Sequence, residues 1–252
     1  MTIGSRLRVA GLVALVALPN PASSQWPVGQ GNYWGKLSVF HHKTTDQFRA
    51  SGEKRPFLNT DAESRSTAVF LDGLVGVTNR LDLWVQVPYF DLHFDDVNVN
   101  RVSTGIGDLR LSARYNLLQL RDGSLPISVR FTTKVPIVDF PIDAEIIPVG
   151  EGQWDYEVWL ESGISFWPLP AYSVVWLGYR WRSLNEETTR DPGDEFTFLA
   201  EVGGTSLVGG LGAKAVLDGI FGQSGSVQRV DVSNDEREIL YLAPTLLYNF
   251  TE

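Results

Sequence analysis

The sequence has no cysteine, one methionine and three histidines among its 252 residues. The absence of cysteine excludes disulfides, thiolate metal sites and cysteine nucleophiles together. Basic residues are also few, since 21 Lys and Arg stand against 30 Asp and Glu and the formal net charge is −9. No basic stripe is left to neutralise phosphates, so the composition argues against a nucleic-acid partner.

Long apolar runs are scarce as well. The run VAGLVALVAL, residues 9–18, follows two arginines and precedes the small residues of PNPASSQ. These three regions predict a secretory signal peptide over residues 1–24, cleaved near Ser24/Gln25, with a mature domain over 25–252. The run is too short to cross a bilayer as a helix, and no later stretch approaches the ~20 apolar residues that such a helix needs. A helical membrane protein is therefore excluded.

Glycine and aromatic residues are abundant instead. The chain has 24 Gly and eight Trp, and 12% of its residues are aromatic. Without windows rich in helix-forming residues, this composition favours antiparallel β-structure.

The run GIGDLRLSARYNLL, residues 105–118, alternates polar and apolar side chains. Its polar positions fall on one face of an extended chain and its leucines on the other, which predicts a β-strand between two different solvents. Ten segments with such alternation follow one another: 33–41, 63–77, 80–92, 105–119, 125–137, 154–167, 172–183, 195–206, 211–222 and 238–250.

Segment length and loop length indicate the class of β-protein. Most segments are longer than an ordinary strand and suit a tilted membrane-spanning strand. Short turns alternate with long polar loops, and aromatic residues gather near strand ends. The prediction is an all-β fold, a transmembrane antiparallel up-and-down β-barrel of about 10–12 strands. Tight turns are expected at 78–79, 121–124, 169–170 and 208–210, long loops at 42–62, 93–104, 138–153, 184–194 and 223–237, and interfacial aromatics at Trp34, Tyr89, Tyr115, Trp154, Trp167, Trp181, Tyr248 and Phe250.

Four runs carry a family resemblance. TGIGDLRLSARYNL, VRFTTKVPI, IPVGEGQWDYEVWLESGISF and VWLGYRWR resemble the outer-membrane barrel family of transporters linked to the meta-pathway of phenol degradation. The resemblance spans roughly residues 35–250, and its motifs are strand and turn patterns. It implies a single-chain barrel, often of about twelve strands, that passes small hydrophobic or aromatic compounds.

The end of the chain departs from that family. Ten strands are counted before Phe250-Thr251-Glu252, so either the barrel has ten strands or a final hairpin is lacking. Pro244 lies near the centre of the last segment and predicts a bulge or an unpaired stretch there.

The charged side of the strands is expected to face an aqueous or polar lumen. If the turn at 121–124 joins its two strands in simple register, Arg110 faces Lys134 and Arg114 faces Arg130. Like charges directly opposite destabilise a sheet, so other strands must offset them. The candidate lumen-lining residues are Asp108, Arg110, Arg114, Arg130, Lys134, Glu157, Glu161, Arg180, Arg182, Glu201 and Lys214.

Two interpretations of these charges stay open. They form either a balanced network that fills the barrel or a constriction with a cationic wall. A constriction would orient a polar or anionic group of a solute, while Trp84, Trp159 and Trp176 contact its apolar part.

Enzymatic and metal-binding roles have little support. A barrel hydrolase needs a histidine beside a serine and an orienting acid, and the spacing of the three histidines singles out no such set. Adjacent histidines on a strand point to opposite faces, which disfavours a metal site. We predict no enzyme, no catalytic residue, no metal and no cofactor. The residues weighed are His41, His42, His93, Ser38 and Asp91, together with the loop acids Asp95, Asp96, Asp139, Asp143, Glu145 and Glu151, which form a solvated rim or bridge lipopolysaccharide through divalent cations.

The expected function is an outer-membrane channel or transporter for small molecules, which the family resemblance places among uptake proteins for hydrophobic or aromatic compounds. A non-conducting structural or surface-recognition barrel and an outer-membrane lipid hydrolase are the alternatives. The expected location is the bacterial outer membrane, and the expected partners are its lipid, lipopolysaccharide and a small-molecule solute.

Overall fold

The computed structural model describes residues 15–17, 26–48, 53–56, 62–138, 147–232 and 236–248. The predicted leader cleavage site at Ser24/Gln25, the loop acids Asp139, Asp143 and Glu145, and Phe250 lie outside the described residues. In the described part of the chain, no helix is long and apolar enough to cross a membrane.

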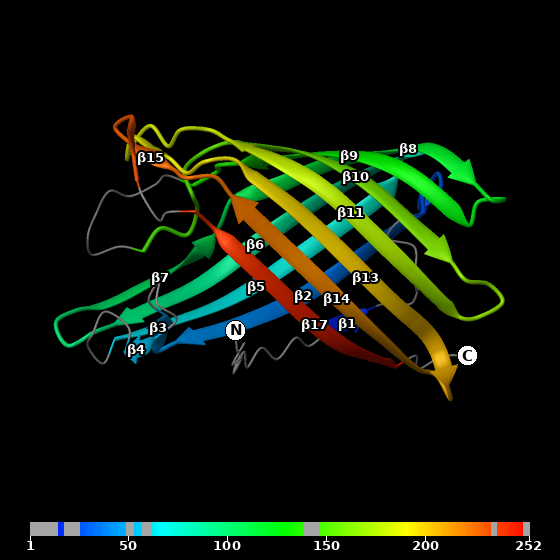
Figure 1. The fold of residues 1–252 in the computed structure, drawn as a ribbon, viewed down its shortest axis with the longest axis horizontal. Coiled ribbons are helices and arrows are strands. Elements are labelled where there is room, and N and C mark those ends of the chain that lie inside the picture. Colours follow the sequence, from blue (N-terminus) through cyan, green and yellow to red (C-terminus); the bar gives the residue numbers. More distant parts are fainter. Residues whose placement is uncertain are drawn as a thin grey trace.

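The chain forms one large antiparallel β-sheet whose oblique strands curl into a half-barrel (Figure 1). Neighbours in the sheet are neighbours in the chain, which is the up-and-down order predicted. The strands of this sheet are β1 (Leu15–Ala17), β2 (Tyr33–Thr44), β5 (Glu63–Gly76), β6 (Leu81–Asp95), β7 (Asn100–Ile106), β8 (Leu109–Leu120), β9 (Leu125–Val135), β10 (Asp155–Ser165), β11 (Ala171–Arg182), β13 (Glu195–Val208), β14 (Leu211–Gly222) and β17 (Glu238–Tyr248).

All ten predicted strand segments are present, and one of them is interrupted. The segment 105–119 divides into β7 and β8, which pair one after the other with β6. The break falls at Gly107, where an added Cβ would lie 2.5 Å from the Phe90 ring and 2.8 Å from the Val149 carbonyl. The prediction of a long loop over 93–104 is wrong, because β6 and β7 pair as far as Asp95 and Asn100.

Three of the other long loops contain short strands of their own. A hairpin of β3 (Asp46–Phe48) and β4 (Lys54–Pro56) lies between β2 and β5. A small sheet joins two further loops through β12 (Arg190–Asp191), β15 (Ser226–Val227) and β16 (Val230–Asp231). The long loops therefore lie at one end of the barrel, opposite the short turns (Figure 1), and two of them pair with each other.

The sheet is open along one edge. Within the described residues no backbone pairing joins β17 to β1 or β2, and β1 pairs with Lys36–Ser38 of β2. Pro244 sits opposite Ala215 in an unbroken register between β14 and β17, so the expected bulge is absent. A proline is tolerated there because β17 is an edge strand and its missing donor leaves the ladder to β14 intact.

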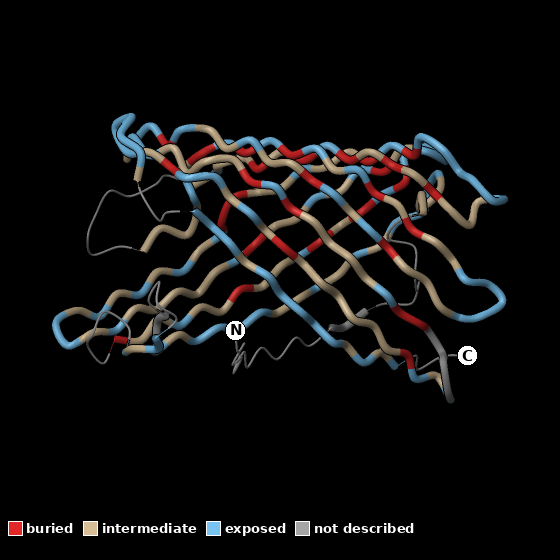
Figure 2. Tube along the Cα trace, in the orientation of Figure 1, coloured by how far each residue is buried: buried red, intermediate tan, exposed pale blue. Residues whose placement is uncertain are grey.

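Burial separates the two faces of the sheet, and red and blue positions alternate along the strands in Figure 2. Leucine, valine and aromatic side chains on the outer face remain exposed, whereas polar and charged side chains on the inner face are buried. This arrangement inverts that of a water-soluble sheet and matches a barrel with an apolar outer band. Exposed outer residues include Leu71, Leu83, Tyr89, Leu111, Tyr115, Phe131, Leu160, Leu177, Trp181, Leu242 and Tyr248.

The apolar outer band has a clear limit at the long-loop end. On β6 the outward positions are apolar from Leu83 to Tyr89 and then become Asp91 and His93. Trp34 departs from the predicted interfacial belt, because its ring packs edge-on against Trp84 at 5.7 Å on the inner face.

Adjacent residues of β14 test this division of faces. Val216 points inward opposite Glu201, whereas Leu217 points outward opposite Ala200. Leu217→Arg is expected to lower the free energy of unfolding by about 2–4 kcal/mol, since its charge would meet lipid near the midplane. Val216→Arg is the matched control and is expected to cost much less. The measurement is urea titration of both variants in lipid vesicles, and equal costs would contradict the assignment of the faces.

Candidate functional site

Charged side chains cover the inner face of strands β6 to β13. Asp82, Glu157, Glu161, Arg114 and Arg130 are each 8% exposed or less. A charge removed from water in this way is tolerated only beside charges of opposite sign. The inner face is therefore built as a network of ion pairs.

The predicted juxtaposition of cations across β8 and β9 is confirmed. Arg110 lies opposite Lys134, and Arg114 lies opposite Arg130. A register shift follows between Asn116 and Leu118, nearer the turn. Four cations thus meet on two neighbouring strands, and the carboxylates that offset them come from the strands on either side.

Arg114 and Arg130 share the centre of this network. Asp82 accepts hydrogen bonds from Nη2 of Arg114 at 2.6 Å and from its Nε at 3.1 Å. Glu161 lies 2.5 Å from Nε of Arg130 and 3.8 Å from Nη1 of Arg114. Each guanidinium is therefore neutralised by a carboxylate of a flanking strand.

Three tryptophans enclose the Arg130 guanidinium. Its carbon lies 5.5 Å from the ring centre of Trp84, 5.0 Å from that of Trp159 and 4.9 Å from that of Trp176. These distances are within the range of cation–π attraction. The sequence predicts that these rings contact the apolar part of a solute, whereas the structure places them against Arg130.

A second group of charges lies closer to the long loops. Glu157 accepts from Arg110 and from Nε of Arg180, the latter at 2.7 Å. Glu195 accepts from Arg180 at 2.5 Å and from Arg182 at 3.2 Å. Cations and acids thus alternate from strand to strand, so the cationic wall of the constriction hypothesis is interleaved with carboxylates.

The segment before β10 is tied into this network. Asp108 accepts the backbone N–H of Glu151 at 2.8 Å. Lys134 contacts the Glu151 carboxylate and lies 2.8 Å from Asp155 and 3.9 Å from Asp108. Burial alone would raise the pKa of Glu151, but Lys134 and Arg182 outweigh it and lower the pKa to about 2. Glu151 therefore stays charged and holds its segment against the wall.

Glu201 and Lys214 form a separate pair on β13 and β14. Lys214 Nζ lies 3.0 Å from Glu201, and the Tyr172 hydroxyl donates to the same carboxylate at 2.5 Å. All eleven candidate residues lie on the inner side, and nine of them belong to the two groups of charges above, which Trp159 links by donating to Glu157 and contacting Arg130.

Sequence reasoning omitted four acids that complete the network. Asp72, Asp82, Asp155 and Glu195 are 1–2% exposed and each contacts a cation. Asp82 and Glu195 already stand on the polar side of their alternating segments, so the parity of their positions could have identified them. The cations that these acids contact are determined by the register across several strands. The parity of a position within one strand does not predict that register.

The end of the barrel with the short turns holds a further feature, the N-terminal strap, residues 26–31. The Trp26 indole donates to the Gly123 carbonyl at 2.7 Å, and Arg114 donates to the Trp26 carbonyl at 3.1 Å. The strap therefore reaches from the start of β2 to the turn between β8 and β9.

The strap is also fixed along its length. Val28 N–H donates to Asp82 at 3.2 Å, and Gly31 N–H donates to the Gly76 carbonyl at 2.9 Å. A Cβ added to Gly76 would lie only 2.0 Å from the Gly29 carbonyl, so this approach requires glycine at position 76. No alternation marks residues 26–31, and the sequence gives no signal for the strap.

The histidines lie apart from the inner network. His93 pairs with Asp91 at 2.9 Å, and His41 contacts the Thr67 hydroxyl at 2.9 Å. Where the structure describes the chain, no hydrogen bond joins a histidine to a serine. No group of three histidine or acidic side chains in the described ranges could hold a metal ion.

A solved structure shares this architecture. The crystal structure of the COG4313 outer membrane channel from Pseudomonas putida F1 is similar with a TM-score of 0.73 and 16% sequence identity, over 92% of this chain and 88% of that chain. The chain has the fold of an outer-membrane β-barrel. At this identity the likeness shows the fold alone. No family model matches the chain, and no curated protein matches it, so the link to phenol degradation stays a prediction.

Proposed function

We propose that the protein is an outer-membrane channel or transporter for small molecules. The proposal rests on one observation: the same strands have an exposed apolar outer face and a buried charged inner face. Such strands suit a wall between lipid and a polar lumen. The similar fold of a protein described as an outer membrane channel adds support. The predicted leader over residues 1–24 and the apolar outer face support a location in the outer membrane, in contact with lipid and lipopolysaccharide.

The inner wall favours solutes that are hydrophobic or aromatic and carry a polar group. Its charge is densest on β8 to β11, whereas the inward positions of β13, β14 and β17 mix apolar side chains with Glu195, Glu201, Lys214 and Asp218. A solute between these two parts can contact charge on one side and hydrocarbon on the other. The apolar residues that point inward are Leu199, Val216, Ile220, Ile239 and Ala243. Their direction follows from the register, because each lies opposite an inward-facing residue of the neighbouring strand.

Planar-bilayer conductance of the refolded protein tests this proposal. Arg110→Gln is expected to shift the reversal potential toward cation selectivity, because it removes a partly exposed inner cation. The fold should tolerate the change, since Glu157 keeps Arg180 as a partner. Arg65→Gln removes the same charge from an exposed position on β5, in register with Lys43 and His93, and serves as the control. Absence of conductance in the wild type would refute the channel proposal.

A non-conducting surface-recognition barrel is the second candidate. It is favoured by the ion pairs that most of the inner charges form and by the strap across the short-turn end. In this second candidate function, the long loops bind a partner molecule, and the ion pairs of the barrel interior only stabilise the barrel that holds the loops. A folded wild-type protein without conductance would favour this candidate.

A further inference from the structure

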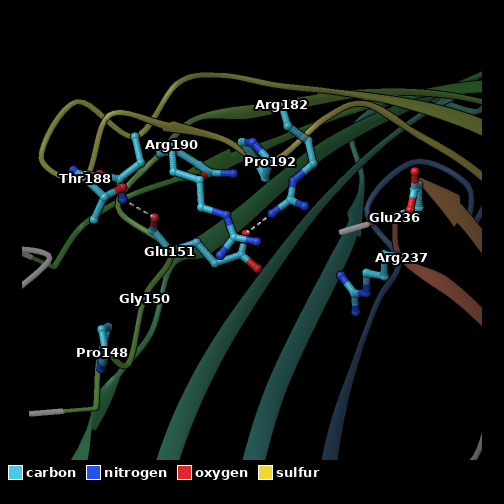
Figure 3. Close-up of a pocket in the computed structure, with 11 residues that line it drawn as sticks. Pro148, Gly150, Glu151, Arg182, Thr188, Arg190, Pro192, Glu236 and Arg237 are labelled. Atoms are coloured by element: carbon cyan, nitrogen blue, oxygen red, sulfur yellow. Dashed lines mark hydrogen bonds and ion pairs between the residues drawn. The ribbon is translucent and has the colours of Figure 1, made fainter. Parts of the chain in front are cut away.

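A cavity of about 640 Å³ opens between the long loops (Figure 3). Its walls come from the segment before β10, the loop after β11 and the segment before β17. Its volume lies in the range of small-molecule pockets. Because it sits at the long-loop end and shares Arg182 with the inner network, it adjoins the mouth of the barrel.

Three arginines and two glutamates line the cavity: Arg182, Arg190, Arg237, Glu151 and Glu236. Both acids already have partners. Glu151 accepts from Lys134 and, at 3.0 Å, from Arg182, and Glu236 accepts from the Ser224 hydroxyl. The charge of Glu151 is thus compensated by two cations, whereas Glu236 keeps its charge and directs it toward Ser224.

Arg237 is the cation most available to a ligand. Its side chain is 44% exposed, and its ion pair is a long contact of 3.5 Å to Glu195. Glu195 is closer to Arg180 and Arg182, so it binds Arg237 weakly. In Figure 3 the Arg237 guanidinium lies across the cavity from Arg190. Among the described residues, this planar guanidinium has no other side-chain partner, and a guanidinium can bind a carboxylate through two parallel hydrogen bonds.

The remaining walls include two proline rings. Pro148 and Pro192 both line the cavity, and in Figure 3 they lie apart from each other and from Arg237. Most of the lining residues are polar or charged, so the cavity suits a small ligand with an anionic group and a limited apolar part.

We infer that this cavity binds small organic carboxylates, with Arg237 holding the carboxylate and Pro148 or Pro192 contacting the apolar part of the ligand. The inference names the class of solute that the outer mouth captures. Its role in transport rests on the proposed channel function, whereas binding of the carboxylate does not require conduction.

The test is equilibrium binding to the full chain refolded in detergent micelles. Benzoate is titrated calorimetrically, with benzyl alcohol as the uncharged comparison, and titrations into empty micelles are subtracted. Benzoate is expected to bind about tenfold or more tightly than benzyl alcohol, and Arg237→Gln is expected to weaken benzoate about tenfold. Arg237→Lys should lie between them, because it keeps the charge and loses the fork. Arg121→Gln, in the short turn at the other end, should leave the affinity unchanged.

Two results would overturn the inference. One is equal affinity for benzoate and benzyl alcohol, and the other is unchanged benzoate affinity in Arg237→Gln. The mobility of unheated and heated samples in electrophoresis verifies the fold of each variant, and Arg190→Gln provides a second variant if Arg237→Gln does not fold. Conductance without benzoate binding would refute this inference alone, whereas binding without conductance would refute the channel alone.

Discussion

Glu161→Gln is expected to lower the free energy of unfolding by about 3–5 kcal/mol. Glu161 is 1% exposed, and its carboxylate lies 2.5 Å from Arg130 and 3.8 Å from Arg114. The amide keeps the size and removes the charge, so Arg130 would remain buried with no carboxylate beside it. The tryptophans around Arg130 attract its charge, but a cation–π contact contributes only about 0.5–2 kcal/mol. They therefore cannot replace the acid.

Urea titration in lipid vesicles measures this cost. The control is Glu63→Gln, which removes the acid of the exposed pair with Lys43 and is expected to change stability by about 0–1 kcal/mol. A double variant, Glu161→Gln with Arg130→Met, should recover part of the loss, because it also removes the stranded charge. Equal costs for Glu161→Gln and Glu63→Gln would mean that the inner network is as hydrated as the surface.

The strands could be predicted because their signal is local. A strand between lipid and a polar interior must alternate at every second residue, so each of the ten segments carries its own evidence. The register of β8 and β9 was also predictable, since a tight turn fixes which residues face each other. This is why Arg114 and Arg130 could be placed together before their partners were known.

The site could be predicted only in part, because its partners are distant in sequence. Glu161 meets Arg114 across β9, and Asp82 meets it from β6, so both contacts depend on the order of several strands. Alternation places Trp84, Trp159 and Trp176 on the inner face, but it does not show that they converge on one guanidinium. The loop segment at Glu151 lies outside any strand pattern, and its contacts with Asp108 and Lys134 have no local signal.

The N-terminal strap has a direct consequence for conduction. It crosses the short-turn end and is held by five hydrogen bonds to the barrel wall and its turns, two of them involving the buried pair of Asp82 and Arg114. Deletion of residues 26–30 is therefore expected to raise single-channel conductance several-fold, because it clears chain from one mouth. Arg114 and Asp82 keep each other as partners, so the barrel should still fold.

Trp26→Ala tests the same point with a single substitution. It removes the indole bond to Gly123, which is the farthest anchor of the strap from β2, and should give more frequent opening with a smaller gain in conductance than the deletion. Trp154→Ala is the matched control, since this tryptophan is 42% exposed at the long-loop end, and its loss should leave conductance unchanged. If the deletion variant folds and conducts no better than the wild type, the strap does not limit flow. The limit would then lie in the ion pairs around Arg114 and Arg130, which lie on the inner wall beside the strap.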